Sequence, residues 1–144
     1  MAVTWVLVAD SSRARIFSKK NGEPYAEVEG MIHPESRMHE QQLTSDLPGS
    51  DSGGGGAERH AYAQRTPPKR HEAMVFSKQV VERLEAARSE RCFRDLMVVA
   101  PPSFLGMLRD EFSGGLSSMV KREINKNLVQ MKTQDLLEHL PRRI

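Results

Sequence analysis

The feature that most constrains the fold is the near-continuous apolar run "TWVLVAD" at residues 4–10. A strand with one face in water alternates apolar and polar side chains, whereas a strand covered on both faces is apolar throughout. The run therefore predicts a strand that is central to a sheet and covered on both sides. A second run, "DLMVV" at residues 95–99, is followed by two prolines and predicts another buried strand.

Two turn signals divide the amino-terminal part into a meander. The short polar link "DSSR" at residues 10–13 favours an antiparallel hairpin between the first strand and a second one at residues 14–20. "NGEP" at residues 21–24 is a further turn. A third strand is expected at residues 25–33, with a bulge near Glu29 and Gly30 because the apolar positions lose their period of two there.

The clearest helix covers residues 66–90, with Thr66 as a candidate cap and Pro67 in its first turn. Its apolar positions recur at helical spacing and form one stripe: Ala73, Phe76, Val80, Leu84 and Ala87. Its basic residues lie largely off that stripe and are expected to face water: Lys69, Arg70, Lys78, Arg83, Arg88 and Arg91.

The remaining elements alternate between helix and strand. A helix is expected from Pro102 until "SGG" stops it, then a strand near residues 118–124 and a last helix capped by Thr133. A short, mostly polar helix is a further expectation at residues 34–46. This order predicts an α/β three-layer sandwich with a mixed five-stranded sheet. Residues 1–144 are predicted to form a single domain, with a flexible Gly-rich loop at about residues 47–66.

Charge is distributed unevenly along the chain. Residues 1–52 hold five Lys and Arg against eight Asp and Glu, whereas residues 53–144 hold sixteen against eleven. The excess of positive charge in the second part suggests an anionic partner such as RNA or phosphate, and an ordinary solvated surface is the alternative.

The chain lacks the marks of an exported or membrane protein. Its first residues have no basic region, and the apolar run is too short to span a bilayer. The single cysteine, Cys92, excludes an internal disulfide and fits a reducing compartment. A cytoplasmic protein without membrane insertion is therefore predicted. Cys92 lies near Arg91 and Arg94, which would favour a reactive thiolate, but a buried structural cysteine is the preferred interpretation.

Several kinds of site are not indicated by the residue spacings. Four of the histidines fall within forty residues, yet they have no zinc-site spacing and no cysteine partner, so no metal and no cofactor is predicted. The four consecutive glycines lack the Gly-Lys-Ser/Thr end of a phosphate loop. Asp10 is expected to form a local turn with Ser11 and Ser12 rather than to bind a metal.

Three stretches carry a family resemblance: "WVLVADSSRARIF" at residues 5–17, "LMVVAPPSFLGMLRDEF" at residues 96–112, and "VKREINKNLVQMKTQDLLEHL" at residues 120–140. Together they closely resemble the bacterial family named "protein required for attachment to host cells". That family is similar to the middle domain of the class-1 release factors of eukaryotes and archaea. The resemblance implies a ribonuclease-H-like sandwich, in which a Gly-Gly-Gln loop precedes a long helix and promotes hydrolysis of peptidyl-tRNA.

The glycines at residues 53–56 stand where that loop would be, but Ala57 and Glu58 follow them instead of glutamine. Gln64 lies eight residues beyond Gly56. The resemblance therefore implies a ribosome or RNA contact rather than a peptide-release reaction, and no catalytic residue is assigned. The alternatives are a peptidyl-tRNA or RNA hydrolase that uses the loop, and a protein-interaction module with an indirect role in attachment.

The segment from Gly53 to His71 is accordingly the candidate binding arm. Its arginines and lysine can neutralise phosphate, its tyrosine can stack on an unpaired base, and a helix start adds positive potential. A solvated loop is the alternative. The predicted RNA- or ribosome-binding residues are Gly53, Gly54, Gly55, Gly56, Arg59, His60, Tyr62, Gln64, Arg65, Lys69, Arg70 and His71.

Overall fold

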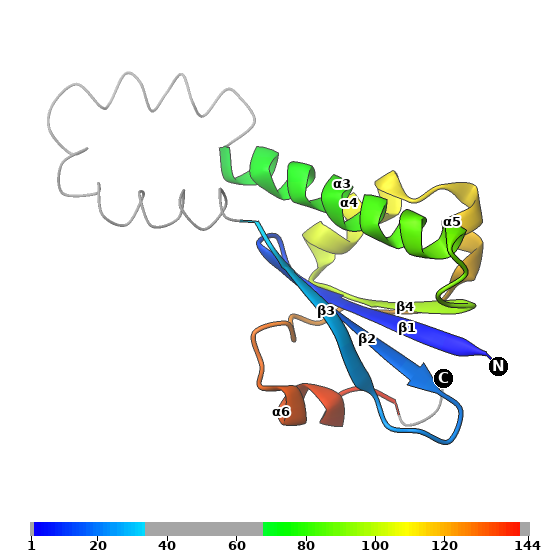
Figure 1. The fold of residues 1–144 in the computed structure, drawn as a ribbon. Coiled ribbons are helices and arrows are strands. Elements are labelled where there is room, and N and C mark those ends of the chain that lie inside the picture. Colours follow the sequence, from blue (N-terminus) through cyan, green and yellow to red (C-terminus); the bar gives the residue numbers. More distant parts are fainter. Residues whose placement is uncertain (1, 34–67, 142–144) are drawn as a thin grey trace, which may run out of the picture.

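The computed structural model describes residues 2–33 and 68–141, which form a sheet with helices on both of its faces (Figure 1). The elements follow in the order β1 (Val3–Ala9), β2 (Arg13–Lys20), β3 (Ala26–Ile32), α3 (Pro68–Ser89), β4 (Asp95–Val99), α4 (Pro102–Glu111), α5 (Gly114–Met119), β5 (Val120–Ile124) and α6 (Thr133–Glu138).

The five strands are arranged in the order β3-β2-β1-β4-β5. The meander β1–β2–β3 is antiparallel, whereas β4 lies parallel to β1 and β5 lies parallel to β4. This mixed five-stranded sheet, with helices on both faces, confirms the predicted α/β sandwich. The connection from β3 to β4 returns along the sheet through α3 because these two strands run in the same direction.

The central strand explains the apolar run that dominates the sequence. Trp5 and Leu7 of β1 pack into the core on the side of α3, α4 and α5, while Val6 and Val8 pack into the core between the sheet and α6 (Figure 1). Both faces of β1 are therefore buried, as predicted. The predicted stripe of α3 is also confirmed, because all five of its residues lie in the first of these cores: Ala73, Phe76, Val80, Leu84 and Ala87.

Two local predictions need correction. "SGG" does more than stop α4: the Ser113 hydroxyl accepts a hydrogen bond from the Leu116 N–H at 3.0 Å and caps α5, so β5 begins only at residue 120. The bulge predicted near Glu29 and Gly30 is confirmed and falls at Val28. Thr133 is the first residue of α6 and not its cap. The helix predicted at residues 34–46 and the loop at 47–66 lie outside the described residues.

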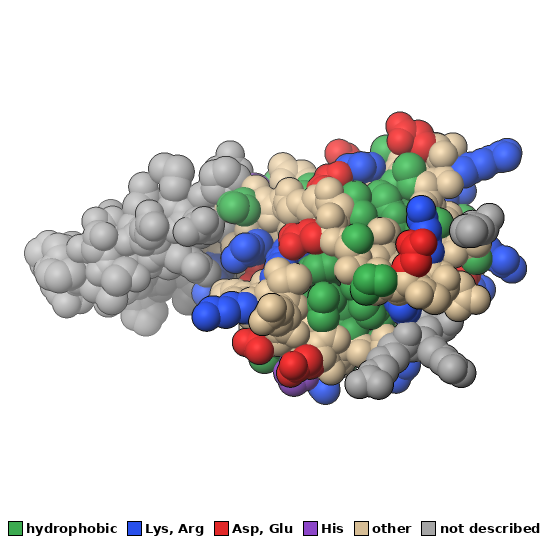
Figure 2. Space-filling model, turned by 60° about the horizontal axis from the view of Figure 1, so that its bottom comes forward, with side chains coloured by type: hydrophobic (Ala, Val, Ile, Leu, Met, Phe, Trp, Pro, Cys, Tyr) green, Lys and Arg blue, Asp and Glu red, His purple; other side chains and the backbone are tan. Residues whose placement is uncertain are grey.

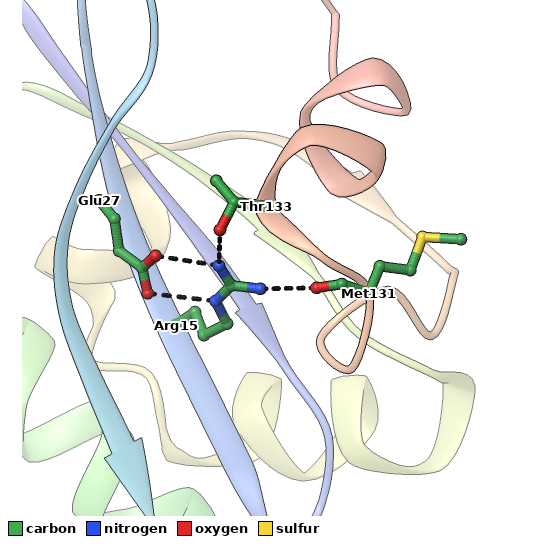
Figure 3. Close-up of polar contacts among 4 residues, drawn as sticks. All are labelled: Arg15, Glu27, Met131 and Thr133. Atoms are coloured by element: carbon green, nitrogen blue, oxygen red, sulfur yellow. Dashed lines mark hydrogen bonds and ion pairs between the residues drawn. The ribbon is translucent and has the colours of Figure 1, made fainter.

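A buried guanidinium joins α6 to the sheet (Figure 3). Arg15 of β2 is only 6% exposed, and its Nε and Nη2 donate to the Glu27 carboxylate at 3.1 and 2.9 Å. Its Nη1 donates to the Met131 carbonyl at 2.9 Å, and its Nη2 also donates to the Thr133 hydroxyl at 2.6 Å. The guanidinium also lies over the ring of Phe17. Arg15 thus holds the chain before α6 against β2 and β3.

This contact predicts a loss of stability in acid. The hydrogen bond from Arg15 holds the pKa of Glu27 below its ordinary value of 4.5, so folding favours the ionised carboxylate. That stability is present in full above about pH 4.5 and is lost as the pH falls through the lowered pKa of the folded state. Urea unfolding should show that the free energy of unfolding falls less between pH 7 and pH 3 for Glu27→Gln than for the wild type. Glu138→Gln, exposed on α6, removes the same charge and should retain the wild-type slope; equal slopes for all three proteins would contradict the prediction.

Candidate nucleic-acid interface

The site is built at the end of the sheet where the parallel strands β1, β4 and β5 finish. We call it the carboxyl end of the sheet. Helix α4 begins directly after β4 at this end, and α3 also begins there (Figure 1). The chain leaves β1 for β2 on one side, while β4 lies on the other, so the connections diverge at this point. In open α/β sheets such a divergence is the usual place for a ligand.

Asp10 closes the turn between β1 and β2 at this end. Its Oδ1 accepts hydrogen bonds from the backbone N–H groups of Ser12 and Arg13 at 2.9 and 2.8 Å. Its Oδ2 faces the Gln130 amide at 3.5 Å. The buried carboxylate is therefore occupied by the turn, which confirms the structural interpretation of this residue. Within residues 2–33 and 68–141, no three His, Cys, Asp or Glu side chains come together as a metal site.

A buried histidine links the end of β3 to the start of α3. His33 is 1% exposed, and its Nε2 lies 2.6 Å from the Glu72 Oε2. Its ring stacks on Phe76 with 5.5 Å between the centroids, and its backbone N–H donates to the Ser12 carbonyl at 2.9 Å. His33 directly precedes residues 34–67 and Glu72 lies shortly after them. The contact thus joins two residues that are 39 positions apart in sequence. Sequence reasoning considered His33 only as a metal ligand and missed this pair.

Exposed basic side chains lie at the start of α3. Lys69, Arg70 and His71 are all exposed, and the first turn of the helix holds no acidic residue. Arg13, which is also exposed, lies opposite Ile32 at the same end of the sheet. Lys and Arg side chains are visible at the left end of the face shown in Figure 2, where α3 begins. The positive end of the helix dipole adds to the potential of these side chains, so this end suits an anionic ligand.

The basic face of α3 is smaller than the sequence predicted. Arg83 forms an ion pair with Glu29 of β3 at 2.9 Å, and it lies over the ring of Trp5. Its hydrogen bond to Glu29 raises the pKa of the Arg83 guanidinium. Arg88 pairs with Glu85 at 3.0 Å on the same helix. These arginines hold the helix in place, so the cations that face solvent on α3 are concentrated towards its amino-terminal half.

The structure describes only part of the predicted binding arm. Lys69, Arg70 and His71 lie exposed in the first turn of α3, close to the His33–Glu72 pair in sequence and in space. The other predicted residues lie outside the described part of the chain, and their role stays a prediction: Gly53, Gly54, Gly55, Gly56, Arg59, His60, Tyr62, Gln64 and Arg65.

Cys92, predicted to be buried, is only partly so. It packs against the core on the side of α3, and its thiol lies 3.8 Å from the Glu90 carboxylate. The thiol is therefore more exposed than predicted.

Comparison with known proteins identifies the family that this chain matches. Residues 5–140 match the family described as "Protein required for attachment to host cells". A relative in Rickettsia prowazekii (strain Madrid E), the uncharacterized protein RP470, is 31% identical over 71 residues. That match covers 48% of this chain and 47% of the relative, so the chain spans about half the length of the curated relative that it matches.

Three solved structures have a similar chain path at low sequence identity. An archaeal translation termination factor is 11% identical with a TM-score of 0.48, and the match covers 86% of this chain and 30% of that one. A structure described as an archaeal protein is 10% identical with a TM-score of 0.47, covering 94% and 35%. The Ppx/GppA phosphatase of Aquifex aeolicus is 12% identical with a TM-score of 0.45, covering 87% and 36%.

None of the helices in the described ranges is long and apolar enough to cross a membrane.

Proposed function

The chain belongs to the family of proteins required for attachment to host cells, and from this premise we propose that it is a non-enzymatic RNA-binding domain. Its target is ribosomal or other structured RNA. The contact is made at the carboxyl end of the sheet, by the start of α3 and the segment that precedes it.

The observation that carries this proposal is the exposure of Lys69, Arg70 and His71 on one helix start. A phosphate group placed there meets both the basic side chains and the positive end of the helix dipole. The same helix is anchored from below, because Phe76 is buried beneath His33 and Arg83 is paired with Glu29. A rigid base for the cations lowers the entropy lost on binding.

The sequence before α3 supports the same ligand. It adds Arg59 and Arg65 as phosphate ligands and Tyr62 as a stacking ring. Gly-Gly-Gln is absent from it, which favours binding over hydrolysis.

Ribosome co-sedimentation tests the proposal. At about 50 mM salt the wild-type protein is expected to pellet with ribosomes, and at about 300 mM salt most of it should be released, because phosphate contacts exchange with salt ions. Lys69→Glu/Arg70→Glu should weaken the association about tenfold at low salt and flatten its salt dependence.

The matched control reverses two cations at the opposite end of the sheet. Lys20 and Arg94 are both exposed and lie beside Val3, at the start of β1. Lys20→Glu/Arg94→Glu changes the net charge equally and should leave the association unchanged. If the wild-type protein does not pellet at low salt, or if both double variants lose binding to the same degree, the proposal fails.

A further inference from the structure

A groove of about 490 Å³ runs along β5, at the opposite edge of the sheet from β3. One wall is formed by Arg109 and Phe112 at the end of α4 and by Ser117 of α5. The other wall is residues 120–123 of β5 itself. A helix-lined groove beside a strand edge is the geometry in which proteins bind extended peptides.

The outer edge of β5 has backbone groups available for such a ligand. Among the described residues, β5 pairs with β4 alone. The Ala100 N–H donates to the Ile124 carbonyl at 3.1 Å, so the backbone of Ile124 faces β4. Because successive residues of a strand turn their N–H and C=O groups to opposite sides, the N–H and C=O of Glu123 face away from the sheet.

The charges along β5 favour an acidic ligand, and Arg122 lies on the face of the strand that it shares with Met97 of β4. Arg109 donates to the Glu123 carboxylate, with 3.0 Å between Nε and Oε1, and this ion pair joins α4 to β5. Lys121 and Arg122 are exposed, and neither forms an ion pair within the described ranges. The strand has a bulge at Lys121, where the pairing with β4 slips by one residue. A bulge re-aims the local side chain and disfavours indiscriminate pairing at the edge.

We propose that this groove binds an acidic, extended peptide segment of a partner protein, which adds to the sheet as a strand beside β5. Backbone hydrogen bonds at Glu123 align the peptide, and Lys121 and Arg122 select its carboxylates. A peptide fits better than RNA because the outward N–H and C=O groups match another peptide backbone. A second copy of β5 is the alternative occupant of this edge, and the dimer outcome below tests for it.

Fluorescence anisotropy with a labelled peptide of four Glu-Val repeats tests the selection of charge. Saturable binding is expected at about 50 mM salt. Lys121→Glu/Arg122→Glu should weaken it at least tenfold, while Lys20→Glu/Arg94→Glu should leave it unchanged. Equal binding of a Lys-Val repeat, or no binding of the acidic peptide, would overturn the proposal.

A pair of substitutions at one position tests the backbone contact. Glu123→Ala removes the ion pair and keeps the outward N–H, so it should bind the acidic peptide at least as well as the wild type. Glu123→Pro also removes that N–H. An edge strand tolerates proline, so the variant should fold but lose at least tenfold in affinity for the peptide. An acidic peptide that is N-methylated at alternate residues should also bind the wild-type protein with at least tenfold lower affinity. This measurement does not depend on the folding of the proline variant.

Two outcomes would assign the groove to another occupant and so refute the proposal. The first is displacement of the acidic peptide by a single-stranded RNA oligonucleotide, with Lys121→Glu/Arg122→Glu losing RNA binding as well. The second is a dimer in sedimentation that Glu123→Pro dissociates. Neither outcome bears on the RNA contact at the start of α3, which is tested by different residues.

Discussion

Arg15→Met is expected to lower the free energy of unfolding by about 3 kcal/mol. The substitution keeps an unbranched apolar side chain over Phe17 but removes every donor of the buried guanidinium. The Glu27 carboxylate then loses its fork of two hydrogen bonds, and the Met131 carbonyl and Thr133 hydroxyl lose a donor each. Because the Glu27 side chain is 38% exposed, water replaces part of what is lost there. The cost therefore lies at the lower end for a broken buried ion pair.

Urea unfolding followed by circular dichroism measures this effect, with Arg13→Met as the control. Arg13 is on the same strand but exposed, so its substitution should change the stability by less than about 0.5 kcal/mol. Arg15→Met/Glu27→Met removes both charges and should recover part of the loss, because no carboxylate is left unpaired. A loss below about 1 kcal/mol for Arg15→Met would show that the contact in Figure 3 does not hold α6 to the sheet.

Phe76→Ala is expected to have the largest effect of any single substitution considered, about 4 kcal/mol. Phe76 is fully buried on α3 and stacks between His33 and Phe104, with centroid distances of 5.5 and 6.0 Å. Its removal leaves a cavity between the end of β3, the long helix and α4. The ring of His33 also loses the surface that orients it towards Glu72, so the loss extends to the carboxyl end of the sheet.

Thermal and urea unfolding of Phe76→Ala and Met74→Ala provide the measurement. Met74 lies two residues away on α3 and is 41% exposed, so its truncation should cost less than about 0.5 kcal/mol. Phe76→Leu should fall between the two, since it fills part of the cavity. If Phe76→Ala unfolded at the same urea concentration as Met74→Ala, the packing described around His33 would be wrong.

The fold could be predicted from periodicity because the spacing of apolar residues in each strand and helix reflects which of its faces are buried. The unbroken apolar run of β1 requires cover on both faces, and the cores beneath α3 and above α6 supply it. The stripe from Ala73 to Ala87 requires one buried face, and α3 has it. The errors fall where side chains act locally. Ser113 caps a helix that begins with two glycines, a residue pair that the sequence alone indicates as a stop.

The candidate site was only partly predictable. Lys69, Arg70 and His71 were found because charge and exposure at a helix start depend on neighbouring residues alone. The groove along β5 was missed. It needs Arg109 and Glu123 to face each other across 14 positions, and it needs the strand order to leave β5 at an edge.

By itself, the sequence determined which segments are strands and helices and which of their faces are buried, because those properties repeat within a few residues. Only the tertiary structure decided the long-range polar pairs: His33 with Glu72, Arg15 with Thr133, and Asp10 with Gln130. The members of these pairs are 39, 118 and 120 positions apart. These contacts depend on strand order and register. A hydrogen bond requires a donor–acceptor distance of about 3 Å, and no periodic pattern of the sequence predicts that two distant residues will reach it.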